Sequence, residues 1–422
     1  MRIVHVNRSD IKGGAAIAAS RIVKSIKDLG FDTSFLVARK ESFENIKTTV
    51  PVASNLYRKT LLQYYFAKEL FYFIPKEKNR SARFAWSAAK YGFDISTHPL
   101  IQSADIIHLH WINQGYLSLT SLHKLFKLNK PVVWTLHDMW SFTGGCHYAG
   151  ECDNYTIECG NCQFLKICKS DDLSFYHHRI KREIYLNINK IAFVPCSKWL
   201  AEKASNSSLI KDHQIKAIPN PIDIDIYRSL DKNHARRELG LPLNKKLVLF
   251  GAANISDGRK GFDLLIRSLQ LLKKRGSYNE AELLLFGKTP SGVQNRLPLN
   301  AHIMGYISDK ETLIKLFNAA DIFALPSLED NLPNTVMESL ACGTPVVAFN
   351  TGGVPEMIDH KKSGYLARIA DYYDFASGME FLLSNSEELN MHVNARDTIL
   401  EKYSPAVVAQ KYIDLYSSLL SL

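Results

Sequence analysis

No segment of this 422-residue chain is apolar enough to cross a membrane, and its N-terminus lacks the pattern of a secretory leader. A membrane-spanning helix needs roughly 18 uncharged apolar residues, and no run in the sequence approaches that length. The first residues, MRIVHVNRSD, contain no charged segment that leads into an apolar one, so we expect a strand there instead of a signal peptide. The sequence therefore predicts a cytoplasmic protein.

The composition excludes wholesale disorder and a single small domain. Hydrophobic residues make up 46% of the chain and charged residues 22%, which is the balance of a globular protein. A chain of this length is too long for one ordinary core, so we expect two domains of roughly 200 residues each.

The positive charge is concentrated in the first half of the chain. Residues 1–220 carry 30 lysines and arginines against 18 acidic residues, a net charge of +12, whereas residues 221–422 carry 22 and 24, a net charge of −2. This asymmetry favours an anionic partner for the first half. No nucleic-acid-binding motif accompanies the charge, so no nucleic-acid partner is expected. An anionic membrane surface fits better, and a solvated basic surface is the alternative.

Short β-rich segments alternate with longer helical patterns, which is the signature of βαβ units and parallel sheets. Strands are expected at residues 3–6, 33–37, 106–109, 132–136 and 191–195, and then at 247–250, 282–286, 322–325 and 345–349. Helices are expected at residues 15–29, 262–273, 332–341, 371–383 and 405–420. The predicted fold class is α/β, with one doubly wound sheet in each half of the chain.

Two prolines within residues 218–223 indicate a rigid link between the halves. We therefore expect one domain over residues 1–220, a second over 221–404, and a C-terminal helix over 405–422. Two segments of the first domain interrupt the alternation of strands and helices. We expect both to be insertions: residues 40–100 and 140–172.

A glycine pair, Gly13 and Gly14, stands between the first predicted strand and an alanine-rich helix. Glycine lets the backbone approach a ligand, and the N-terminus of the helix offers free N–H groups to an anion. The dinucleotide-binding pattern G-x-G-x-x-G is missing, so a purely structural turn is the alternative.

The most informative stretch begins with two acidic residues. Asp330 precedes a predicted helix and Glu338 lies about two turns inside it, and helix capping is the ordinary role of acids at such places. The next predicted strand ends just before Gly352 and Gly353, so two strand ends present polar groups and glycines at one edge of a sheet. Carboxylates at that edge can accept hydrogen bonds from the vicinal hydroxyls of a ribose or another sugar.

These residues resemble the motif of glycosyltransferase family 4, a large family of retaining enzymes with the GT-B fold. Its members carry two acids with seven residues between them, followed by a helix of small residues and a C-G-x-P-V-V strand, which corresponds here to residues 342–347. The resemblance implies that Glu338 binds the donor's ribose, and that Asp330 and Asn331 contact the transferred sugar. The sequence departs from the family where a Gly-aromatic-Gly segment usually follows the first acid, because Pro333 cannot donate a backbone N–H there.

The resemblance implies further residues on both halves of the chain. Arg259 and Lys260 correspond to the cations that grip the donor diphosphate, where fixed positive charge stabilises the leaving group. The segment ADIIHLHW resembles the family's D-x-x-H-x-H strand end and puts His110 beside the donor sugar. His137 and Asp138 end the next strand in a similar way and are weaker candidates for contact with either substrate.

The family resemblance also implies the architecture and the reaction. Two Rossmann-like domains face a cleft, the donor lies mostly on the second domain and against Gly13 and Gly14, and the C-terminal helix crosses back to the first domain. The sugar is transferred with retention of configuration, and the departing diphosphate itself takes the acceptor's proton. No D-x-D motif appears where a metal-dependent transferase would hold its diphosphate, so no catalytic cofactor is expected.

The donor base remains open among UDP-, GDP- and ADP-sugars. Residues 137–162 resemble bacterial colanic-acid and capsule-type transferases, which implies a glycan or lipid-linked glycan acceptor in the synthesis of a surface polysaccharide. Two alternatives come from other functional classes. One is a nucleotide-sugar epimerase or related enzyme without a glycan acceptor, and the other is a non-catalytic scaffold or nucleic-acid-binding protein.

Four cysteines cluster in the second insertion with the spacing C-x5-C-x6-C-x2-C: Cys146, Cys152, Cys159 and Cys162. The last pair has the spacing of a zinc knuckle, whereas the first pair is looser than a standard site. Structural zinc, buried free thiols and disulfides are the three interpretations, and a reducing cytoplasm disfavours the last.

Residues 61–73 are apolar and aromatic, and basic residues flank them on both sides. At helical spacing, one face of this segment would consist of Leu62, Tyr65, Phe66, Leu70 and Phe73. An ordinary core helix is one interpretation. The other is a helix that lies on the inner face of the cytoplasmic membrane, with its basic flanks on anionic lipid.

Overall fold

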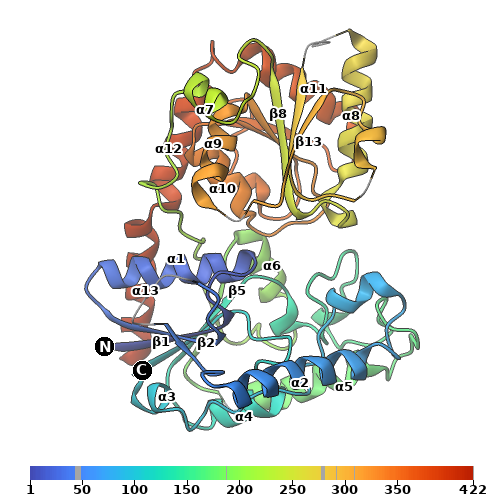
Figure 1. Ribbon diagram of the computed structural model, residues 1–422. Helices are drawn as coiled ribbons and strands as arrows, with labels where there is room; N and C mark the ends of the chain where they lie inside the picture. The colour runs from blue at the N-terminus through green and yellow to red at the C-terminus, as the bar shows by residue number, and fades with distance from the viewer. Residues whose placement is uncertain (43–48, 187, 277–280, 291, 308, 422) are drawn as a thin grey trace. The chain divides into compact units, whose positions relative to one another are not determined.

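The computed structural model describes residues 1–42, 49–186, 188–276, 281–290, 292–307 and 309–421 (Figure 1). The chain divides into two compact units. The first unit comprises Met1–Pro221 together with Val408–Leu422, and the second comprises Ile222–Val407. Residues 43–48 of the insertion expected at 40–100 lie outside the described residues.

The first unit is built on a seven-stranded parallel sheet with the order β3-β2-β1-β4-β5-β6-β7. Its strands are β1 (Arg2–Ser9), β2 (Asp32–Arg39), β3 (Thr49–Pro51), β4 (Ile106–Leu109), β5 (Val132–Leu136), β6 (Ile191–Pro195) and β7 (Gln214–Ile215). The strand order reverses between β1 and β4, so the carboxyl ends of these two strands form the switch point at which ligands of such sheets bind. The register of β1 against β4 pairs His5 with His108.

The helices of this unit carry apolar residues at helical spacing. They are α1 (Gly14–Asp28), α2 (Leu56–Phe73), α3 (Pro99–Ser103), α4 (Leu119–Phe126), α5 (Leu173–Tyr185) and α6 (Lys198–Ser205). In α1 the buried residues Ala19, Ile22, Val23 and Ile26 share one face, which explains why an amphipathic helix forms here and which side it buries.

One face of the first sheet is covered by a helix from the far end of the chain, α13 (Pro405–Leu420), drawn in red in Figure 1. Its buried residues recur every three or four positions: Val408, Ala409, Tyr412, Ile413, Leu415, Tyr416 and Leu419. They belong to one hydrophobic cluster with Ile22 and Ile26 of α1 and with Ile3, Ile106 and Val133 of the sheet. The core of the first unit is therefore completed by residues that follow the second unit in sequence.

The second unit contains a six-stranded parallel sheet with the order β10-β9-β8-β11-β12-β13. Its strands are β8 (Leu247–Asn254), β9 (Glu282–Lys288), β10 (Ala301–Gly305), β11 (Ile322–Leu325), β12 (Val346–Phe349) and β13 (Gly364–Ala367). Its helices are α7 (Lys232–Glu238), α8 (Phe262–Arg275), α9 (Lys310–Ala319), α10 (Asn334–Ala341), α11 (Tyr372–Asn385) and α12 (Met391–Tyr403). Every residue of β11 and β12 is buried, as expected for central strands with helices on both faces.

The predicted α/β class, with a doubly wound parallel sheet in each half, is confirmed. The sequence pattern does not predict β3, β7, β10 and β13, because these edge strands contain only two to five residues. The helix expected from residue 332 begins at Asn334, because Pro333 is the N-cap and has an extended ψ of 120°.

Of the two interpretations of residues 61–73, the contacts of the expected face support the core helix, and membrane contact by this segment stays a prediction. Leu62 and Phe73 are buried, Tyr65 packs against the core of the first unit, and the Phe73 ring stacks on Trp86 with centroids 4.8 Å apart. Helical spacing gives the same pattern for a core face and a membrane face, and here the apolar face packs against the core. No helix among the described residues is both long and apolar enough to cross a membrane.

Because α13 completes the first core, Leu415→Ala should destabilise the first unit. The side chain of Leu415 is 1% exposed, so its removal leaves a cavity, and we expect the free energy of unfolding to fall by about 2–5 kcal/mol. Leu420→Ala, on the same helix at a residue that is 43% exposed, is the matched control and should change it by less than about 0.5 kcal/mol. Urea unfolding measures both. Equal effects would mean that α13 does not belong to this core.

Candidate active site

Three loops meet at the carboxyl edge of the second sheet, after the neighbouring strands β8, β11 and β12. The backbone N–H of Leu328 donates to the carbonyl of Arg259 over 2.8 Å, which joins the loops after β11 and β8. The hydroxyl of Thr351 donates to the carbonyl of Leu328, and the N–H of Gly353 donates to the carbonyl of Asp330, which joins the loops after β12 and β11. The site is therefore held by main-chain contacts between loops.

Two glycines allow these loops to approach so closely. A Cβ atom on Gly261 would lie 1.8 Å from the carbonyl oxygen of Pro326, and one on Gly352 would lie 1.8 Å from the carbonyl oxygen of Asp330. Both glycines also have positive φ, at +67° and +57°. Any side chain at either position would separate the loops that carry the polar groups.

Lys260 and Asp330 form an ion pair across two of these loops. The Lys260 Nζ lies 2.6 Å from Asp330 Oδ2, and both side chains are mostly buried. Arg259, by contrast, directs its guanidinium to Asp257 in its own loop at 2.9 Å, and it is more exposed. The structure thus brings together Lys260 and Asp330 of the predicted set, and it turns Arg259 towards another acid.

Glu338 and Asn331 are also buried at this edge. Glu338 lies on α10, the helix that follows the loop carrying Asp330, and Asn331 follows Asp330 directly. A buried carboxylate is costly unless hydrogen bonds or opposite charge compensate it, so acids are rarely placed in such positions without a partner or a function. One cation, two carboxylates and an amide thus line the carboxyl edges of two adjacent strands.

In the first unit, Gly13 and Gly14 stand where β1 leads into α1. Gly13 is the N-cap of the helix and Gly14 its first residue, and both are exposed. The space within 4 Å of a Cβ on Gly13 is open, so the turn and not a close approach explains the glycine. The N-terminus of α1 lies at the end of the same strand that carries His5.

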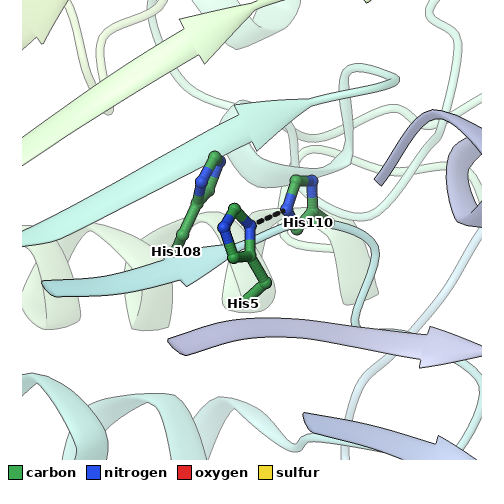
Figure 2. A group of neighbouring side chains, drawn as sticks. All are labelled: His5, His108 and His110. Carbon is green, nitrogen blue, oxygen red and sulfur yellow. Dashed lines mark hydrogen bonds between the residues drawn. The ribbon is translucent and has the colours of Figure 1, made fainter. Parts of the chain in front are cut away.

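His110 belongs to a group of histidines that includes His5 in the middle of β1 and His137 directly after β5. Its Nε2 lies 3.0 Å from His5 Nδ1, and its Nδ1 lies 3.4 Å from His137 Nε2. Figure 2 shows His5 reaching from β1 towards His110, with His108 stacked beside them. Within the described residues, His5, His108 and His110 are the only group of three or more potential metal ligands whose donor atoms all lie within 4.8 Å.

His108 connects this group to α13. Its Nδ1 lies 2.6 Å from the Tyr416 hydroxyl, and its Nε2 lies 2.7 Å from the Thr135 hydroxyl. The Thr135 hydroxyl lies in turn 2.8 Å from that of Tyr412. His108 therefore has a structural explanation: it pairs buried polar groups of the sheet with the tyrosines of the helix that covers them.

Burial keeps these imidazoles neutral. Desolvation lowers the pKa of His5 to about 3 and that of His137 to about 4, although Asp138 opposes the shift of His137. Desolvation, together with the neighbouring imidazoles, holds the pKa of His110 well below its ordinary value. At neutral pH each ring therefore offers one N–H donor and one acceptor nitrogen.

The Asp138 carboxylate accepts three hydrogen bonds from neighbouring groups. It accepts hydrogen bonds from His147 Nδ1 at 2.7 Å, Trp111 Nε1 at 3.0 Å and the backbone N–H of Trp140 at 2.8 Å. Burial alone would raise the pKa of Asp138, but these partners offset it, and the pKa lies below its ordinary value. The carboxylate holds the loop after β5 in place, which leaves His137 as the accessible group of the pair.

Sequence reasoning missed His5 and Lys181. A histidine inside the apolar segment IVHV was the available signal for His5, because a polar residue there must face another polar group. Lys181 of α5 is wholly buried and donates to the carbonyls of Trp140 and Thr143, and desolvation lowers its pKa to about 7. The sequence analysis predicts no helix at this position, and only the tertiary contact reveals the role of Lys181.

The cysteine loop of residues 140–172 contains only short 3-10 turns among its described elements. Cys159 accepts a hydrogen bond from the backbone N–H of Gly144, and Cys162 packs in a small cluster with Trp86. Desolvation raises the pKa of Cys146, Cys159 and Cys162 to about 12. Within the part of the chain that the structure describes, the four sulfurs form no disulfide and no group with metal-ligand spacing.

The spacing of these sulfurs favours the interpretation as free thiols over the zinc site, and the metal content of the protein separates the two. We expect purified protein to contain far less than the roughly one equivalent of zinc that a structural site holds, and to keep its melting temperature in a chelator. Elemental analysis with thermal unfolding decides the question. One equivalent of zinc that is lost in Cys159→Ser, with a lowered melting temperature, would instead establish the zinc site.

Each half of the chain matches a known protein family. Residues 12–226, about half of the chain, match the family described as Glycosyltransferase Family 4. Residues 244–385 match the family described as Glycosyl transferases group 1. The two matched regions together contain each of the candidate residues described above except His5 and the α13 tyrosines.

Curated relatives and solved structures agree with these matches. The chain is 27% identical over 218 residues to N-acetyl-alpha-D-glucosaminyl L-malate synthase of Bacillus anthracis, covering 50% of this chain and 56% of the relative. It is 27% identical over 278 residues to the putative colanic acid biosynthesis glycosyl transferase WcaC of Escherichia coli, covering 63% of each. These matches span less than two thirds of the relatives' lengths.

In fold, the chain is similar to Anabaena HepE, a protein solved in complex with UDP, with a TM-score of 0.64, 18% identity, and coverage of 99% of this chain and 100% of that one. The two parallel-sheet Rossmann-like units are those of the GT-B architecture that the sequence predicts.

Proposed function

This chain belongs to glycosyltransferase family 4, and we propose that it transfers a sugar from a nucleoside-diphosphate sugar to a glycan acceptor with retention of configuration. The observation that carries the proposal is the Lys260–Asp330 ion pair at the carboxyl edge of the second sheet, with Glu338 buried on the following helix. Lys260 and Glu338 stand at the positions of the family's lysine and second acid, and Asp330 stands where the family usually has a glutamate as its first acid.

Each group has a chemical task in this proposal. Glu338 accepts hydrogen bonds from the ribose hydroxyls, which places the nucleotide on the second unit. Asp330, with Asn331 beside it, contacts hydroxyls of the transferred sugar. Lys260 donates to the diphosphate, whose negative charge grows as the glycosidic bond breaks. Arg259 can contact the diphosphate only if its guanidinium leaves Asp257. We therefore assign Arg259 a smaller contribution to diphosphate binding than Lys260.

The bond changes follow from this arrangement. The bond between the anomeric carbon and the diphosphate oxygen breaks through an oxocarbenium-like transition state, and the acceptor oxygen attacks on the same face. The departing diphosphate takes the acceptor's proton. No carboxylate nucleophile is assigned. In the first unit, Gly13, Gly14 and His110 are proposed to meet the donor sugar and diphosphate, and we propose no metal in the reaction.

The acceptor is proposed to be a lipid-linked glycan in the synthesis of a bacterial surface polysaccharide. The relative named for colanic acid biosynthesis supports this, as does the basic charge of the first half of the chain. The alternative is an epimerase or hydrolase of nucleotide sugars. Such an enzyme would convert the donor at the same rate with and without acceptor, so product analysis separates the two.

Glu338→Gln tests the donor site. We expect the preferred donor, found by thermal shift among UDP-, GDP- and ADP-sugars, to lose about 1.5–3 kcal/mol of binding free energy for each charge-assisted hydrogen bond that is removed. Glu311→Gln, an exposed acid on α9 of the same unit, is the matched control and should bind like the wild type. Isothermal titration measures both. Unchanged affinity in folded Glu338→Gln would remove this residue from the donor site.

We further propose that the outer face of α2 contacts an anionic membrane. Tyr57, Tyr64 and Phe71 recur every seven residues, which puts them on one stripe of the helix, and they are 74%, 51% and 76% exposed. Arg58 and Lys59 are exposed beside the first of them. Aromatic rings at the headgroup level with basic neighbours are typical of interfacial helices.

The triple variant Tyr57→Ser, Tyr64→Ser, Phe71→Ser should lose binding to vesicles of phosphatidylglycerol. The substitutions remove the exposed apolar contact and leave the fold intact. Sedimentation measures binding, and we expect wild-type binding to weaken as salt rises. The control Tyr306→Ser, at an exposed ring of the second unit, should bind like the wild type. If the wild type ignores these vesicles at low salt, the membrane proposal fails and a water-soluble acceptor is favoured.

A further inference from the structure

Three histidines form a hydrogen-bonded row that leads from the interior of the first sheet to its carboxyl edge. We propose that His5, at the buried end of this row, fixes which nitrogen of His110 and His137 carries the proton, and so acts as a positioning residue for the transferase. The inference rests on the proposed function, which puts His110 at the donor end of the first unit. His5, His110 and His137 are called the imidazole row below.

The imidazole row uses both nitrogens of its middle ring. His110 Nε2 lies 3.0 Å from His5 Nδ1, and His110 Nδ1 lies 3.4 Å from His137 Nε2. His5 is 0% exposed and His110 is 2% exposed, whereas His137 is only half-buried. The row therefore has one end sealed in the core and one end that reaches the surface after β5.

The sealed end decides the direction of the hydrogen bonds. His5 Nε2 is buried and has no hydrogen-bond partner among the described residues. A buried N–H without an acceptor is rarer in proteins than an unsatisfied acceptor, so the proton of neutral His5 belongs on Nδ1. It follows that His5 Nδ1–H donates to His110 Nε2 in the hydrogen bond that the dashed line of Figure 2 marks between these rings.

The remaining assignments follow because each ring is neutral and carries one proton. His110 accepts at Nε2, so its proton is on Nδ1, which donates to His137 Nε2. His137 accepts there, so its proton is on Nδ1. Each ring of the row is thus a neutral imidazole with its proton on a defined nitrogen. The row therefore orients the His110 ring without bringing a full positive charge into the site.

A bound metal is the competing explanation for three clustered histidines. His108 uses both nitrogens for Tyr416 and Thr135, and His110 uses both for His5 and His137. A metal ligand must point a lone pair at the ion, so a metal here would break most of these hydrogen bonds. The hydrogen-bonded row accounts for every nitrogen of the group except His5 Nε2.

The experiment reads the tautomers directly. Protein labelled with nitrogen-15 in histidine is studied by long-range proton–nitrogen correlation, and each ring is assigned by substitution. We expect His110 to be protonated at Nδ1 in the wild type. In His5→Phe, we expect a mixture of tautomers at His110 and a fall in kcat by about tenfold, the loss that one ordinary hydrogen bond represents, with KM for the donor changed less than about twofold.

Two further variants separate positioning from packing. His5→Asn retains an N–H donor close to the place of Nδ1, so we expect it to restore the His110 tautomer and most of kcat. His108→Gln disturbs a ring stacked 4.2 Å from His110 that makes no hydrogen bond to it, so the His110 tautomer should stay unchanged even if stability falls.

Three results would overturn the inference: a wild-type His110 protonated at Nε2, a His110 tautomer that His5→Phe leaves unchanged, or one equivalent of metal bound through these rings. The tautomer is read without any substrate. If no sugar is transferred, the proposed function fails, and the tautomer measurement still judges this inference separately. If transfer is found and the tautomer does not respond to His5, only this inference fails.

Discussion

The first unit depends on a helix that the chain supplies only after it has built the second unit. The sheet from β1 to β7 has an apolar face that α1 covers in part, and α13 covers the rest with a stripe of side chains from Val408 to Leu419. Burial of such a face is the dominant stabilising contribution to a domain, so the first unit is incomplete without residues that follow the second. The two halves of this chain are therefore linked in folding as well as in sequence.

The same helix explains the polar groups beneath it. Tyr412 and Tyr416 are wholly buried, and their hydroxyls need partners there, which Thr135 and His108 provide. With His108 held by the helix, its neighbour His110, which directly follows the end of β4, is directed towards His5 and His137. A packing requirement on one side of the sheet thus determines the surroundings of the histidine that the family motif singles out.

The two units hold their polar residues by different physical means. In the second unit an ion pair, Lys260 with Asp330, joins loops that main-chain hydrogen bonds and two glycines bring together. In the first unit the polar residues at the strand ends are imidazoles that burial keeps uncharged. The second unit thus presents a charged pair at its strand ends, whereas the first presents uncharged hydrogen-bond donors and acceptors.

The sequence by itself determined the alternation of strands and helices, the fold class and the family, because periodicity and turn residues act locally and the motif around Asp330 and Glu338 is contiguous. The resemblance to the family's Lys-Gly element also pointed to Lys260. Tertiary structure alone decided which apolar face of α2 is buried, because a core face and a lipid face have the same periodicity. It alone decided that Arg259 turns to Asp257 and that His5 meets His110. Residues 5 and 110 have no local relation, and only the pairing of β1 with β4 brings their rings within hydrogen-bonding distance.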